Sequence, residues 1–116
     1  MPEALPDETR YRLLKYLEAN PDASQRALAR EMGVSLGKIN YCIRALLDRG
    51  WIKVQNVKNS DNKLAYKYLL TPTGIEQKAR ITVRFLKKRL EEYETLEQEI
   101  ASLREEVNEL RNSKNA

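Results

Sequence analysis

The chain has 116 residues, of which 41% are hydrophobic and 33% charged, and its net charge is +4. This length suits one compact domain plus one extension. Because it holds one cysteine, Cys42, and no histidine, an internal disulfide, a Cys/His zinc site and histidine-based catalysis are all excluded. Composition leaves carboxylate catalysis open, but we expect no enzyme, no catalytic residue, no metal and no cofactor.

The N-terminal sequence shows no targeting signal. No apolar stretch approaches the roughly 18 residues that span a bilayer. Residues 1–8 contain neither a basic segment nor an apolar segment of the signal-peptide type. We therefore expect a cytoplasmic protein without a membrane partner.

The positive charge is concentrated in one part of the chain. Residues 36–67 hold seven basic side chains and two acidic ones, whereas residues 71–116 hold nine of each sign. Such a local excess is typical of a surface that meets phosphates. The alternative is an ordinary solvated face.

Three helices are predicted after a flexible arm at residues 1–6. Each begins at a side chain that can cap a helix, and the second and third end at a glycine. The predicted helices cover about 7–20, 25–32 and 36–49, with Asp7, Ser24 and Ser35 as caps and Gly33 and Gly50 as terminators.

A hairpin and a long helix follow. The runs 51–57 and 64–70 are rich in strand formers, and a polar turn at 58–63 separates them. Thr71 can cap the last helix, with Pro72 at its first position, and nothing breaks this helix before Asn112. The order predicts a mainly α fold with a small β-hairpin. It is a winged helix-turn-helix domain at 7–72, a C-terminal dimerisation helix at 73–111 and a tail at 112–116.

The segment from 28 to 42 carries the helix-turn-helix pattern. A tight helix crossing needs a small residue in the first helix and a glycine at the turn, and Ala29 and Gly33 meet these needs. Apolar contacts come from Leu28, Met32, Val34, Ile39 and Cys42, continued by Ile43, Leu46 and Leu47. An ordinary helical hairpin is the alternative.

The helical period places a polar face on the outside of the third helix. Asn40 can bond adenine in bidentate fashion, and Arg44 or Lys38 can bond guanine. Gly37 permits a close approach to DNA, and Ser35 with the helix N-terminus can hold a phosphate. Tyr41 could instead pack under the N-terminal helix. The candidate DNA contacts here are Ser35, Leu36, Gly37, Lys38, Asn40, Tyr41 and Arg44.

The predicted wing supplies further candidate contacts. Its polar side chains Lys58, Asn59, Asn62 and Lys63 could reach the minor groove or flanking phosphates. A solvated turn is an equally simple interpretation.

Several segments resemble a known family. LAREMGVS at 28–35 and LTPTG at 70–74 are similar to MarR-type winged-helix regulators. SLGKINYC at 35–42, NSDNKLAY at 59–66 and TVRFLK at 82–87 resemble the EPS-associated MarR-family transcriptional regulators. The resemblance covers roughly residues 8–110. It implies DNA binding and a link to exopolysaccharide genes, and it identifies no small-molecule effector. Compared with larger MarR proteins, we expect this protein to lack their further C-terminal helices.

A heptad pattern begins near residue 93. Tyr93, Ile100 and Val107 fall at a positions, and Leu96, Leu103 and Leu110 fall at d positions. β-Branched residues at a with leucine at d favour a parallel two-stranded coiled coil, so we expect a homodimer.

Flanking charges mostly agree with this dimer. Glu99 would face Arg104 of the second copy and Glu106 would face Arg111, whereas Glu92 and Glu97 would repel. The alternative is a helix that folds back on its own domain.

Together these patterns predict a homodimeric transcriptional regulator that binds double-stranded DNA. The helix at 35–49 would lie in the major groove and the wing at 58–63 on flanking DNA. The alternative function is a winged-helix interaction scaffold that does not bind DNA specifically. Cys42 could act as a redox sensor, but its inward phase favours an inert thiol.

Overall fold

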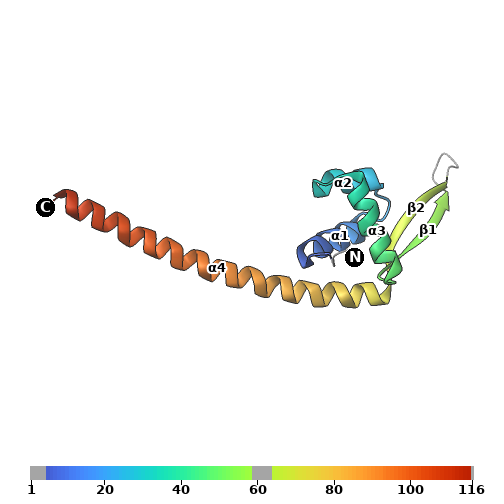
Figure 1. The fold of residues 1–116 in the computed structure, drawn as a ribbon. Coiled ribbons are helices and arrows are strands. Elements are labelled where there is room, and N and C mark those ends of the chain that lie inside the picture. Colours follow the sequence, from blue (N-terminus) through green and yellow to red (C-terminus); the bar gives the residue numbers. More distant parts are fainter. Residues whose placement is uncertain (1–4, 59–63, 116) are drawn as a thin grey trace. The chain divides into compact units, whose positions relative to one another are not determined.

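The computed structural model describes residues 5–58 and 64–115, except for the side chains of residues 57, 58, 64 and 65. Its elements follow the predicted order (Figure 1). They are α1 (Asp7–Ala19), α2 (Gln25–Met32), α3 (Leu36–Asp48), β1 (Ile52–Lys58), β2 (Leu64–Leu70) and α4 (Pro72–Asn115). The predicted fold class, a winged helix-turn-helix followed by a long helix, is confirmed. The chain forms two compact units, residues 1–83 and residues 84–116.

The predicted caps of α2 and α3 are confirmed. The Ser24 hydroxyl accepts a hydrogen bond from the Ala27 amide, and the Ser35 hydroxyl accepts one from the Lys38 amide, each at 3.1 Å. Gly33 ends α2 in the left-handed region at φ 66°, a conformation that glycine adopts without a side-chain clash. Gly33 and Ser35 therefore set the turn between α2 and α3, and Ser24 sets the start of α2.

The predicted start of α1 is wrong in detail. Asp7 is not the cap but the first helical residue, and Pro6 stands before it with no side-chain cap. The Pro6 carbonyl accepts a hydrogen bond from the Arg10 amide at 3.0 Å. Asp7 lies in the first turn, where its negative charge interacts favourably with the positive end of the helix dipole. Leu5 packs against the core, so the arm predicted at 1–6 does not extend that far.

The hairpin is antiparallel, with β1 paired to β2 from Ile52 opposite Leu70 to Lys58 opposite Leu64. On the alternating face of β2, Tyr68 is buried and Leu70 packs against the core. Tyr66 is 61% exposed because it lies two residues farther from the core. The Tyr68 amide donates to the Pro21 carbonyl at 3.1 Å, which attaches β2 to the segment after α1.

One hydrophobic core lies between the three short helices, the base of the hairpin and the start of α4. The Trp51 ring closes one end, with the guanidinium groups of Arg10 and Arg49 at 5.5 and 5.7 Å from its centre. The buried side chains are Leu13, Leu14, Leu17, Leu28, Ala29, Met32, Ile39, Cys42, Ile43, Leu46, Trp51, Ile52, Tyr68 and Ile81.

The entry to α4 forms as the sequence predicts. The Thr71 hydroxyl accepts from the Gly74 amide at 3.0 Å and donates to the Gly50 carbonyl at 2.5 Å. Gly74 is buried against the main chain of Trp51. Thr71 therefore caps α4 and fastens it to the end of α3.

The second unit consists of the rest of α4. This helix reaches Asn115, so the tail predicted from residue 112 is wrong. No glycine or proline follows Arg111 to end the helix there. Lys114 lies in the last turn, where its positive charge interacts favourably with the negative end of the helix dipole. In the described part of the chain, no helix combines the length and apolar character that a membrane crossing requires.

Candidate nucleic-acid interface

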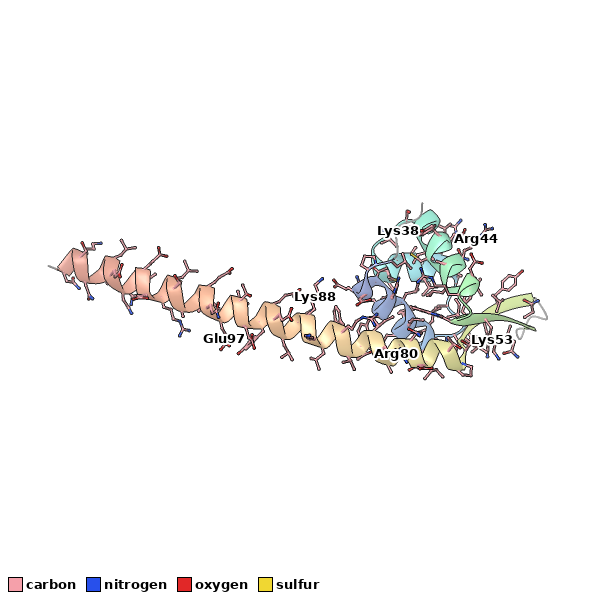
Figure 2. All side chains as sticks on the ribbon, turned by 60° about the horizontal axis from the view of Figure 1, so that its bottom comes forward. Lys38, Arg44, Lys53, Arg80, Lys88 and Glu97 are labelled. Carbon is pink, nitrogen blue, oxygen red and sulfur yellow. The ribbon has the colours of Figure 1, made fainter. Side chains whose placement is uncertain are left out.

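The two faces of α3 differ sharply in burial. Ile39, Cys42, Ile43 and Leu46 are at most 1% exposed and fix this helix against the core. Lys38, Asn40 and Arg44 are exposed. Figure 2 shows Lys38 and Arg44 reaching outward from α3. The packing thus presents amide and cationic groups, which can bond base edges or phosphates, on a rigid helix.

The N-terminus of α3 is open to solvent. Ser35, Leu36 and Gly37 are all exposed, and a Cβ added at Gly37 would meet no atom within 4 Å. The first amides of a helix lack intrahelical acceptors and carry the positive end of the dipole, so this end can receive a phosphate. The predicted close approach at Gly37 is sterically possible.

Asn40 takes part in a hydrogen-bonded chain that the sequence prediction missed. Its Nδ2 donates to Gln25 Oε1 at 3.3 Å, and Gln25 Nε2 donates to the Tyr68 hydroxyl at 3.1 Å. Gln25 is the first residue of α2, so the Ser24 cap and the Gly33 turn bring it beside α3. No local sequence signal identifies this contact, because it joins residues 15 apart on two helices.

A shallow open groove lies where the N-termini of α2 and α3 meet. It is lined by Ser24, Gln25, Arg26, Leu36, Gly37 and Asn40. Arg26 is exposed and adds a cation that the sequence prediction did not include. The candidate interface therefore includes the start of α2 as well as α3.

The surroundings of Tyr41 do not separate the two roles that the sequence left open. It is 40% exposed on the outer face of α3. It also lines a small pocket with Leu5 and Arg10 at the start of α1. Tyr41 is therefore placed both to reach the exterior and to contact the start of α1.

Cys42 lies on the inner face of α3 and is 1% exposed. Burial raises the pKa of its thiol above the ordinary value of 9.0, and the smaller opposing effect of Lys38 does not cancel this. A protonated, buried thiol is a poor nucleophile, so its surroundings are those of a packing residue.

The predicted wing contacts are only partly described. Lys58 ends β1, but its side chain, like Asn59, Asn62 and Lys63, lies outside the described residues. Lys53 is an exposed cation nearer the base of the same strand (Figure 2).

The six predicted dimerisation residues are all exposed on α4. Their exposed fractions lie between 41% and 70%, although they are large and apolar. They are Tyr93, Leu96, Ile100, Leu103, Val107 and Leu110. Among the described residues, no three His, Cys, Asp or Glu side chains are grouped so that they could hold a metal ion.

Residues 6–53 match the sequence family described as winged helix-turn-helix DNA-binding. No curated protein sequence matches the chain. Among solved structures, a transcriptional regulator homologue from Pyrococcus horikoshii OT3 is 19% identical with a TM-score of 0.54, covering 72% of this chain and 81% of that one.

Two further structures carry relevant descriptions. FabT of Streptococcus pneumoniae, solved in complex with DNA, is 21% identical with a TM-score of 0.51, covering 90% of this chain and 72% of that one. A MarR/EmrR family regulator from Acinetobacter sp. ADP1 is 24% identical with a TM-score of 0.53, covering 92% and 75%. At these identities the likeness concerns the fold. The chain therefore contains a winged helix-turn-helix domain, and its residues 6–53 are similar to the family described as DNA-binding.

Proposed function

We propose that this protein is a sequence-specific transcriptional regulator that binds operator DNA as a homodimer. The observation that carries the proposal is the contrast between the two faces of α3. One face is fully buried, and the other presents Lys38, Asn40 and Arg44 to the exterior beside an open helix N-terminus. Such a helix fits the major groove, where asparagine reads adenine and arginine reads guanine.

The MarR family is the proposed relationship. The fold likeness to a MarR/EmrR family regulator supports it, as does the similarity of LAREMGVS at 28–35 to MarR-type regulators. The segments at 35–42, 59–66 and 82–87 resemble the EPS-associated members, which points to operators near exopolysaccharide genes.

The proposed dimer forms through the heptad face of α4. A row of exposed apolar side chains on one helix is costly in water unless a partner covers it. The a and d pattern is self-complementary, and Glu99 with Arg104 and Glu106 with Arg111 would pair across two parallel copies. A second copy is therefore the occupant we infer, and it would bring a second α3 to an adjacent half-site.

Selection of bound duplexes from random DNA, followed by a salt titration, tests the proposal. A regulator should enrich one sequence, and its affinity should fall steeply with rising salt because phosphate contacts release counterions. A protein-interaction scaffold should enrich no sequence and show no steep salt dependence, and that result would overturn the proposal.

A further inference from the structure

We propose that Gln25 and Tyr68 form a relay that orients Asn40 for base readout and so contributes to operator preference. The relay joins three elements, because Asn40 lies on α3, Gln25 on α2 and Tyr68 on β2. It rests on the proposed function, since it assigns positioning residues to the DNA contact of Asn40.

The bond from Asn40 leaves its base-reading groups available. An asparagine side chain has two N–H donors and one carbonyl acceptor. One donor goes to Gln25 Oε1 at 3.3 Å. The second donor and Oδ1 remain, which is the pair that bidentate contact with adenine requires.

Asn40 needs this support because it is exposed. The terminal torsion of an asparagine has a broad, roughly two-fold preference, so an isolated amide on a helix surface samples several orientations. A bond to a fixed neighbour removes this freedom before DNA arrives and lowers the entropy lost on binding.

The relay ends on a rigid support. Gln25 is itself long and flexible, but its Nε2 donates to the Tyr68 hydroxyl at 3.1 Å. Tyr68 is 8% exposed, and its backbone amide donates to the Pro21 carbonyl at 3.1 Å. The orientation of Asn40 is thus tied through Gln25 to a tyrosine packed in the core.

Tyr68→Phe is the sharpest test, because it removes the hydroxyl and keeps the packed ring. Affinity of the full-length protein would be measured for the selected operator and for variants with each base pair changed. The substitution should reduce discrimination by about 2- to 10-fold, the value of one hydrogen bond, at the base pair where Asn40→Ala also reduces it. Discrimination at the other base pairs of the operator should be unchanged.

Two controls separate positioning from stability. Tyr16→Phe removes a hydroxyl from a half-buried tyrosine on α1 and should leave preference unchanged. Gln25→Leu should reduce discrimination at the same base pair as Tyr68→Phe does. Gln25→Glu keeps an acceptor for Asn40 and for the phenol, so preference should persist while its negative charge weakens binding to every sequence.

The double variant Asn40→Ala/Tyr68→Phe supplies the decisive comparison. In the relay, Tyr68→Phe acts only through Asn40 and adds no loss of preference to Asn40→Ala. If Asn40→Ala relaxes preference but folded Tyr68→Phe does not, the relay is overturned and the proposed function stands. If Asn40→Ala itself has no effect on preference, the relay and the readout role of Asn40 both fail.

Discussion

Gly74 packs so closely on Trp51 that a methyl group at position 74 would overlap the Trp51 carbonyl. Because the obstacle is backbone, Gly74→Ala should force the start of α4 away from Trp51. We expect the free energy of unfolding to fall by about 3 kcal/mol or more, which exceeds the roughly 1 kcal/mol that alanine gains in a helix. Urea denaturation followed by circular dichroism would measure this. A variant as stable as the wild type would contradict the packing.

Gly37→Ala is the matched substitution at an open site. A Cβ there meets no atom within 4 Å, so we expect stability to stay the same or rise by up to about 1 kcal/mol. DNA affinity should nevertheless fall, because the methyl group enters the space between α3 and the groove. Thermal melting and fluorescence anisotropy would show the two effects separately. Unchanged affinity would place Gly37 outside the interface.

Leu103→Glu tests the proposed dimer. A charge at a central d position should disrupt the apolar seam, and light scattering should then give a mass near 13.5 kDa instead of twice that value. Ala101→Glu adds the same charge at a position outside the heptad seam and should remain dimeric. A dimeric Leu103→Glu protein would remove the coiled coil from the account.

The sequence predicted the fold well where local rules decide the structure. Ser24, Ser35 and Thr71 are caps and Gly33 is a left-handed turn, because one or two residues determine each of these features. Local rules failed at Asp7, because the helix begins one residue earlier than a cap at this position requires: Asp7 is its first residue, and Pro6 before it makes no side-chain cap bond.

The candidate site was less accessible to sequence reasoning. The helical period separated the inner and outer faces of α3 correctly, since Ile39 is buried and Arg44 exposed. It could not reveal that Gln25 lies beside Asn40, because that contact joins residues 15 apart across a turn. The contact of Gln25 with Tyr68 spans 43 residues and depends on the docking of the hairpin.

Burial of Cys42 makes stability sensitive to alkaline pH. Because burial raises the pKa of this thiol above 9.0, the unfolded chain loses the proton first as the pH rises past 9.0. Unfolding then releases a proton, and the free energy of unfolding falls with increasing pH. Cys42→Ala should show a shallower decline above about pH 9. Equal slopes would contradict the raised pKa.

Because the Cys42 thiol is buried, we also expect that the protein does not sense oxidants through it. Cys42→Ala should keep DNA affinity within a few-fold of the wild type, and peroxide should not release DNA from either protein. Peroxide-dependent release seen only with the wild type would assign a redox role to this thiol.

The contrast between base contacts and phosphate contacts tests the account most directly. Asn40→Ala and Arg44→Ala should each lose about 1–3 kcal/mol of operator binding and relax preference at one position, while weak nonspecific binding remains. Lys38→Ala, Lys58→Ala and Lys63→Ala should weaken binding to all sequences and lower the salt slope by about one. Arg12→Ala, an exposed cation on α1, serves as the control.

The deciding measurement is the ratio of operator affinity to random-DNA affinity for folded Asn40→Ala and Arg44→Ala. The account predicts that this ratio falls by about 5-fold or more for each variant and stays unchanged for Arg12→Ala. If both variants bind operator and random DNA as the wild type does, α3 is not the reading element, and the proposed regulator function fails.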